Sequence, residues 1–342
     1  MRAVVYDEYG SSPRIDRLPA PDCPPDGAVV RVEATGVCRS DWHAWRGHDP
    51  VPLPMIPGHE FAGIVAEVGR EVRGFAVGDR VTAPFVNGCG ACEWCRSGQA
   101  QVCPDQTQPG FTGDGSFAEY VIVRVADLNL VRLRDEVDPV TAASLGCRFA
   151  TAFRAIVGQA GVRAGEEVAV FGCGGVGLSA IMIARALGAR VTAVDLSERA
   201  LARAQDLGAA ATVLSRTPVD EVIAATRGGA HVTIDALGSA ATADAAVRSL
   251  RRHGRHVQVG LMLGAAASAP LPWDRVIAWE LEVSGSHGMS AADYPAMLQL
   301  IVDGALDPGR LVGRVTDLAG AAEALVAMDA APADAGMVVA RL

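Results

Sequence analysis

The stretch Val168-Ala169-Val170-Phe171-Gly172-Cys173-Gly174-Gly175-Val176-Gly177 decides the fold. Its first four residues form a short apolar run, which predicts a buried strand. The apolar segment Leu178–Leu187 follows and predicts a helix. The loop between them fits G-x-G-x-x-G, a weak pattern by itself. Here it has the strand before it and the helix after it that dinucleotide binding requires.

Each position of this loop has a predicted role in holding a dinucleotide. Gly172 permits the tight turn, Gly174 lets the backbone approach a pyrophosphate, and Gly177 lets the helix pack closely on the strand. Gly175 and Val176 complete the predicted cofactor loop, and the helix N-terminus that follows offers free N–H groups and the positive end of its dipole to the phosphates. The alternative is a glycine-rich turn in an unrelated α/β protein.

Asp195 indicates which dinucleotide binds. It ends the next predicted strand, 23 residues after Gly172, where a carboxylate can accept hydrogen bonds from ribose hydroxyls. The same charge would repel a 2′-phosphate, so we predict NAD rather than NADP. Arg199 and Arg203 lie nearby and could soften this preference; Arg199 is included in the predicted cofactor site.

Outward from this loop, strands and helices alternate, which predicts a doubly wound parallel sheet of the Rossmann type. The predicted elements are strands at Arg190–Asp195, Val232–Ala236 and His256–Leu261 and a helix at Glu198–Leu207. Residues 1–147 are instead rich in short strands and turn residues, as at Ala28–Ala34 and Phe61–Gly69. We therefore predict a Rossmann domain at 148–287. A β-rich domain would combine 1–147 with 288–342, where a helix (Tyr294–Asp303) and a final strand (Met337–Leu342) are expected.

Composition excludes several classes of function. The 342 residues carry a net charge of −9 and no run of Lys or Arg, which argues against nucleic acid as a partner. We find no apolar stretch of about 18 residues, so no membrane span is predicted. The N-terminus lacks the apolar core of a signal peptide, and a cytoplasmic location is the default expectation.

Four cysteines form the strongest local motif, Cys89-x2-Cys92-x2-Cys95-x7-Cys103. Four thiolates at this spacing can surround one tetrahedral zinc ion and leave no open position, so a lobe at about 86–104 should hold a structural metal. Disulfides and an iron–sulfur cluster are the alternatives. Cys38, His59 and Cys147 also invite metal binding, but no short spacing links them and the spacing alone does not reveal a site.

Several motifs together resemble the zinc-dependent medium-chain dehydrogenase/reductase family, the alcohol dehydrogenases. They are G-V-C-R-S-D-W-H (36–43), P-G-H-E-F-A-G (57–63), V-G-D-R-V (77–81), the cysteine lobe, G-S-F-A-E-Y (115–120) and G-C-G-G-V-G (172–177). The resemblance implies a GroES-like catalytic domain beside the Rossmann domain. It also implies two zinc ions per subunit, NAD, and hydride transfer between an alcohol and an aldehyde or ketone.

The resemblance assigns the dispersed residues. Cys38, His59 and Cys147 would hold a catalytic zinc with one position open, as in the Cys₂His site of alcohol dehydrogenase. Asp41 would orient the imidazole of His59. Glu60 would approach the metal and help exchange its ligands.

The resemblance also implies a proton route and a substrate pocket. Ser40 would take the proton of the alcohol and pass it through the nicotinamide ribose to His43, whose pKa suits exchange with solvent. Arg39 would reach the pyrophosphate, and Thr151 and Val176 would back the nicotinamide. The predicted substrate pocket is apolar and consists of Trp42, Phe85, Phe111 and Phe149.

Two residues depart from the family pattern. Met337 follows Gly336, where the family often carries a basic residue that meets the cofactor phosphates, and Arg148 directly follows Cys147. Related zinc enzymes acting on a polyol, amino alcohol, formaldehyde or imine remain alternatives, as does a non-catalytic nucleotide-binding relative. A zinc-free quinone reductase is disfavoured by the cysteine lobe and His59. Similar enzymes suggest a homo-oligomer, with a tetramer favoured over a dimer.

Overall fold

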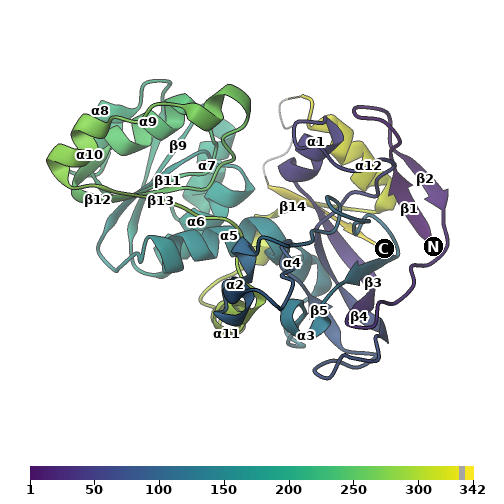
Figure 1. Ribbon diagram of the computed structural model, residues 1–342. Coiled ribbons are helices and arrows are strands. Elements are labelled where there is room, and N and C mark those ends of the chain that lie inside the picture. The colour runs from purple at the N-terminus through teal and green to yellow at the C-terminus, as the bar shows by residue number, and fades with distance from the viewer. Residues whose placement is uncertain (331–335) are drawn as a thin grey trace. The chain divides into compact units, whose positions relative to one another are not determined.

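The computed structural model describes residues 1–330 and 336–342. The chain divides into two compact units (Figure 1). The first unit combines Met1–Ala150 with Gly288–Leu342, and the second is Thr151–His287.

The first unit is built on a seven-stranded sheet in the order β14-β15-β3-β4-β5-β7, with β6 paired to β3. A separate antiparallel pair, β1 and β2, lies near the N-terminus. The strands are β1 (Arg2–Val5), β2 (Arg14–Arg17), β3 (Ala28–Val37), β4 (Glu60–Val68), β5 (Arg80–Thr82), β6 (Tyr120–Val123), β7 (Val131–Arg132), β14 (Val312–Thr316) and β15 (Met337–Arg341). Apolar residues of β3, β4, β5 and β6 form one buried cluster, which fixes the register of these strands.

The same unit contains helices, of which α4 and α12 pack on strands of this sheet. They are α1 (Arg39–Trp45), α2 (Glu93–Arg96), α3 (Ala126–Asn129), α4 (Pro139–Ala143), α11 (Tyr294–Val302) and α12 (Leu318–Ala327). α4 begins with Asp138 as N-cap and Pro139 in its first turn, a favourable helix start. A π-helical turn, Leu145–Phe149, follows it. Turns of this kind occur frequently at functional sites.

The second unit is a six-stranded parallel sheet in the order β10-β9-β8-β11-β12-β13. Its strands are β8 (Glu167–Phe171), β9 (Arg190–Asp195), β10 (Ala211–Leu214), β11 (Ala230–Asp235), β12 (Leu250–Gln258) and β13 (Glu282–Gly285). Its helices are α5 (Ala150–Phe153, whose first residue belongs to the other unit), α6 (Gly175–Ala186), α7 (Glu198–Asp206), α8 (Val219–Ala225), α9 (Ala240–Arg248) and α10 (Trp273–Trp279). α6 packs against α7, and α8 packs against α9 (Figure 1).

The strand order confirms the predicted fold class, a doubly wound parallel sheet accompanied by a β-rich unit. The order reverses at β8, where the chain moves outward first to β9 and later to β11. In such sheets ligands bind beyond the carboxyl ends of the strands at this reversal. The glycine-rich loop after Phe171 lies at that point, because it joins β8 to α6.

Some element boundaries differ from the sequence expectation. β12 begins at Leu250 rather than at the predicted His256. The charged residues Arg251 and Arg252 interrupt the apolar pattern in its first half, so that half was not predicted as strand. β13 was not predicted, since its four residues are largely exposed and lack an apolar run. Within the part of the chain that the structure describes, no helix is both long and apolar enough to span a membrane.

Candidate metal centres and active site

The ends of two paired strands bring Cys38 and His59 together. β3 and β4 run antiparallel with Gly36 opposite Glu60, so the residue after β3 meets the residue before β4. Cys147 arrives from the π-helical turn after α4. One ligand atom each from Cys38, His59, Glu60 and Cys147 lies within 4.8 Å of the others.

Asp41 forms hydrogen bonds that orient residues of this cluster. It is buried in the first turn of α1, and its Oδ1 lies 2.8 Å from Nδ1 of His59. The same carboxylate accepts the backbone N–H of Cys38 at 2.9 Å and that of Gly58 at 3.1 Å. Because this carboxylate accepts from both backbone donors, it is also the acceptor toward the imidazole, and Nδ1 of His59 carries the proton. In the neutral imidazole of His59 the free lone pair is therefore on Nε2.

Nε2 of His59 is buried, and no hydrogen-bond partner for it exists among the described residues. A buried polar atom without a partner destabilises a fold by about 1–3 kcal/mol, so such an atom needs an explanation. A cation shared with the thiols of Cys38 and Cys147 would supply one. Two sulfurs and one imidazole nitrogen, with the other ring nitrogen on a carboxylate, are a donor set that suits zinc.

The two thiols influence each other's ionisation. The hydrogen bond with Cys147 lowers the pKa of Cys38, and the nearby charges of Arg148 and His59 act in the same direction against burial. That hydrogen bond, together with burial, raises the pKa of Cys147. Burial lowers the pKa of His59, but the Asp41 charge and hydrogen bond and the Cys38 sulfur together raise it above its ordinary value.

Glu60 forms a buried ion pair with Arg148. Oε1 of Glu60 accepts hydrogen bonds at 3.0 Å from both the backbone N and Nε of Arg148, and Oε2 accepts one from Nη2. Burial raises the pKa of Glu60, and the positive charge of Arg148 opposes that shift. No role for Arg148 could be predicted from the sequence, because its partner lies 88 residues away. A charged residue within a buried apolar segment was the only signal that such a partner exists.

The four lobe cysteines also converge. Their Sγ atoms lie within 4.8 Å of one another, and none forms a disulfide. Sγ of Cys92 lies 3.7 Å from Sγ of Cys103, close to the roughly 3.8 Å edge of a tetrahedron with about 2.3 Å zinc–sulfur bonds. Burial raises the pKa of Cys95 to about 12, so a cation would be needed to hold this sulfur as thiolate.

Gly88 permits this sulfur packing. A Cβ at Gly88 would lie 2.7 Å from Sγ of Cys95. The lobe therefore fits one ion that is coordinated tetrahedrally by four sulfurs and has no open position.

The residues predicted to move a proton lie on or beside α1. Oγ of Ser40 is 3.8 Å from Sγ of Cys38, which puts this hydroxyl at the edge of the metal cluster. Nδ1 of His43 lies 3.2 Å from Nδ1 of His48, a residue that the sequence reasoning missed. Burial lowers the pKa of His43, and the positive charges of His48 and Arg39 lower it further. A second histidine five residues after His43 was the available signal.

The predicted pocket aromatics have different surroundings. Phe111 and Phe85 present ring contacts to His59, with centroids 5.2 Å and 6.0 Å from the imidazole. Trp42 instead contacts His43 and His48 edge-on, and its Nε1 donates to Asp329 at 2.8 Å. Phe149 is fully buried in the π-helical turn. An apolar wall beside the metal cluster is therefore formed by Phe85 and Phe111.

In the second unit, the glycine-rich loop has the geometry that a dinucleotide requires. Gly172 has a φ of +89°, and a Cβ on Gly177 would lie 1.8 Å from the carbonyl oxygen of Gly172. Gly174 faces open space, so the backbone there is accessible. Asp195 closes the loop by accepting the N–H of Cys173 at 2.7 Å and that of Ser197 at 2.9 Å.

The remaining predicted residues are placed as follows. Gly175 and Val176 begin α6, Thr151 is buried in α5, and Arg199 lies in the first turn of α7. Nη1 of Arg39 donates to the carbonyl oxygen of Met328 at 2.7 Å, and its guanidinium lies 4.8 Å from the ring centroid of Trp42. Met337 is buried at the start of β15, where it contributes no charge.

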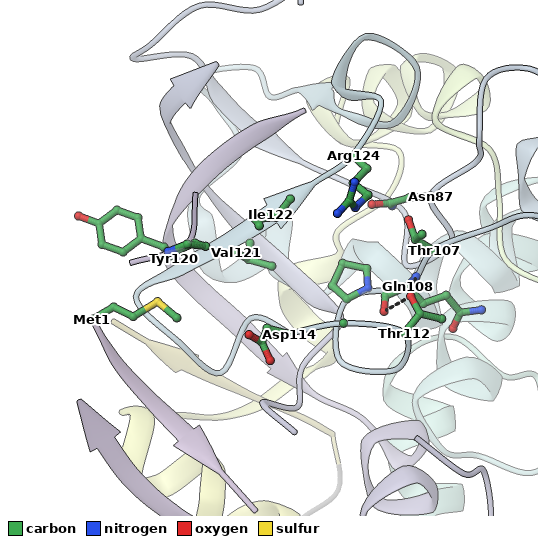
Figure 2. Close-up of a pocket in the computed structure, with 13 residues that line it drawn as sticks. Met1, Asn87, Thr107, Gln108, Thr112, Asp114, Tyr120, Val121, Ile122 and Arg124 are labelled. Carbon is green, nitrogen blue, oxygen red and sulfur yellow. Dashed lines mark hydrogen bonds between the residues drawn. The ribbon is translucent and has the colours of Figure 1, made fainter. Parts of the chain in front are cut away.

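A hollow of about 190 Å³ lies elsewhere in the first unit (Figure 2). Asn87, Gln108, Asp114 and Arg124 are among the residues that line it, and burial raises the pKa of Asp114. None of the predicted metal, proton-transfer or cofactor residues lines this hollow. It is therefore separate from the metal clusters.

Comparisons with known proteins agree with this architecture. Residues 24–135 match the alcohol dehydrogenase GroES-like domain, and residues 175–303 match the zinc-binding dehydrogenase family. An alcohol dehydrogenase of Geobacillus stearothermophilus is 36% identical over 313 residues, which is 90% of each chain.

Solved structures give the same result over the whole chain. The alcohol dehydrogenase TADH from Thermus sp. ATN1 superposes with a TM-score of 0.92 at 32% identity, covering 100% of this chain and 99% of that one. A structure described as an NAD-dependent alcohol dehydrogenase has a TM-score of 0.88 at 32% identity and full coverage of both chains. The chain belongs to the zinc-dependent alcohol dehydrogenases of the medium-chain dehydrogenase/reductase family.

Proposed function

We propose that this protein is a zinc-dependent alcohol dehydrogenase that transfers a hydride between an alcohol and NAD. The observation that carries the proposal is the buried Nε2 of His59, which has no hydrogen-bond partner within residues 1–330 and 336–342, in a residue that clusters with the thiols of Cys38 and Cys147. The first unit would be the catalytic domain and the second the NAD-binding domain. Family membership supports this division, because the two matching family segments fall mainly in these two parts of the chain.

Two zinc ions per subunit would be held by different residues. Cys38, His59 and Cys147 would hold the catalytic ion, and Cys89, Cys92, Cys95 and Cys103 the structural one. A zinc ion held there would supply Lewis acidity toward an alcohol hydroxyl, and NAD would supply the hydride acceptor for oxidation of the alcohol to a carbonyl compound.

The chain's own residues bind, orient and accept a proton. Asp41 holds His59 in the tautomer that presents Nε2 to the cluster. Ser40, beside Cys38, would receive the proton of the alcohol hydroxyl. His43 would exchange that proton with solvent, with His48 as its nearest partner. The lowered pKa of His43 keeps its imidazole neutral near pH 7 and therefore able to accept.

Substrate and cofactor preferences follow from the surroundings of each site. Phe85 and Phe111 favour an apolar primary, secondary or aromatic alcohol over a polyol or a charged acid. Trp42 and Phe149 stay proposed members of the pocket. Asp195 favours NAD, and Arg39, Thr151, Val176 and Arg199 stay proposed cofactor contacts. A homo-oligomer, preferably a tetramer, and a cytoplasmic location also stay predictions.

The test is a scan of NADH formation across primary, secondary, aromatic and polyhydric alcohols, with and without a chelator. We expect NAD-linked oxidation of apolar alcohols that chelation abolishes. Ser40→Ala should lower kcat/KM by about 100-fold or more, the usual scale for a proton-transfer group, while Ser97→Ala, an exposed serine in the cysteine lobe, should not. Oxidation that survives complete removal of zinc would contradict the proposal.

A further inference from the structure

The metal cluster contains one carboxylate with two possible partners. Glu60 offers an oxygen within 4.8 Å of the ligand atoms of Cys38, His59 and Cys147. The same carboxylate is held by Arg148 through its backbone N, Nε and Nη2. The Glu60 side chain is 0% exposed and that of Arg148 is 10% exposed, so the ion pair is shielded from solvent.

A buried carboxylate must be paired, because an isolated charge in the interior is strongly unfavourable. Without Arg148, the nearest cation for Glu60 would be the metal. A structural zinc site has four protein ligands, whereas a catalytic site keeps one position open. Whether Glu60 pairs with Arg148 or with the metal therefore decides whether the site keeps an open coordination position.

We propose that Arg148 is a positioning residue that holds Glu60 away from the metal and so keeps a coordination position open for substrate. The inference rests on the proposed function. The fork of Arg148 occupies both carboxylate oxygens, a geometry that a lysine cannot reproduce.

The backbone on the far side of the pair also restrains it. A Cβ at Gly36 would lie 2.4 Å from Oε2 of Glu60 and 3.1 Å from Nη2 of Arg148. The pair thus packs directly on β3, which restricts rotation of the carboxylate.

The experiment measures access to the open position in the cobalt-substituted protein. Imidazole is titrated as the probe, and its binding is followed by the visible absorption of cobalt. In Arg148→Met we expect the absorption to change before imidazole is added, and imidazole to bind about tenfold or more weakly, because Glu60 must be displaced first. The double variant Glu60→Gln/Arg148→Met should bind imidazole as the wild type does.

Arg148→Lys provides a second route if Arg148→Met does not fold. It keeps a positive charge but loses the two-pronged grip, so a smaller weakening is expected, again removed by Glu60→Gln. Imidazole binding as in the wild type for both single variants would overturn the proposal. A weakening that persists in the double variant, or loss of cobalt from an Arg148→Met variant that is folded, would also overturn it.

Measurements on the wild-type protein distinguish failure of the proposed function from failure of the role of Arg148. If it takes up no cobalt at Cys38, His59 and Cys147, the proposed function fails. If it takes up cobalt and binds imidazole but the variants do not differ, only the role of Arg148 fails.

Discussion

Asp41 and His59 form a buried hydrogen bond, with Oδ1 of the aspartate 2.8 Å from Nδ1 of the imidazole. The same aspartate holds the backbone N–H of Cys38, so one side chain orients two of the three proposed ligands. Residues of this kind typically change metal affinity 10- to 100-fold when they are replaced.

Asp41→Asn should therefore weaken zinc binding at the Cys38 cluster by about 10- to 100-fold. Asparagine keeps the shape, but its amide nitrogen cannot accept the N–H of Cys38. Competition with a chromophoric chelator measures the affinity. Zinc in the four-cysteine lobe is the internal control and should be released as in the wild type. If the Cys38 cluster of the variant releases zinc at the same chelator concentration as that of the wild type, this role of Asp41 is contradicted.

Cys103→Ser should remove one zinc ion per subunit and lower the thermal midpoint. Sγ of Cys103 lies 3.7 Å from that of Cys92, and loss of one ligand opens the enclosed site. Each kcal/mol lost lowers the Tm of a unit this size by about 2–4 °C, so a fall of about 5 °C or more is expected. Calorimetry with metal analysis provides the measurement. Cys23→Ser, outside both clusters, is the matched control, and an equal fall in both variants would argue against a structural metal.

Asp195→Gly should reduce the preference for NAD over NADP. The carboxylate ends β9 beside the glycine-rich loop, where it would repel a 2′-phosphate. We expect the ratio of kcat/KM for NAD to that for NADP to fall by about tenfold or more. Glu198→Gln, which removes a nearby negative charge from α7, should leave the ratio almost unchanged. A wild-type preference for NADP would contradict the cofactor assignment.

His48→Ala should shift the acid limb of the pH profile for alcohol oxidation to higher pH. Burial, His48 and Arg39 lower the pKa of His43, while Cys38 and Asp49 act in the opposite direction. The variant removes a positive neighbour and exposes the ring, and both changes raise the pKa of His43. A base with a higher pKa stays protonated to higher pH, so the activity of the variant should rise at a higher pH than that of the wild type.

The control for this prediction is His253→Ala, which removes an exposed histidine of the second unit. Its profile should match that of the wild type. If His48→Ala also matches the wild type, His43 does not limit proton release.

The sequence predicted the parts of the fold that depend on local patterns. The strand at Arg190–Asp195 has the predicted bounds, and the helix after the glycine-rich loop begins three residues before the predicted Leu178. β12 was harder, because parallel pairing with β11 and β13 stabilises a segment whose own residues are charged. There the strand is stabilised by pairing with its neighbours, which the apolar periodicity of the sequence does not reveal.

The site divides in the same way. The cysteine lobe is local, so its spacing alone predicted that the sulfurs meet. Cys38 and Cys147 are 109 positions apart, and only the pairing of β3 with β4 and the turn after α4 brings them to His59. The pairing of Arg148 with Glu60 follows from a three-dimensional contact that no spacing encodes, whereas His48 lies only five residues after His43.

We infer that Cys38, His59 and Cys147 hold a catalytic zinc ion apart from the structural one. Its most direct test is metal analysis of Cys147→Ser beside the wild type and Cys23→Ser, with alcohol oxidation measured on the same samples. We predict two zinc ions per subunit and activity in the wild type and Cys23→Ser, and one zinc ion without activity in Cys147→Ser. Two zinc ions and full activity in Cys147→Ser would contradict the account.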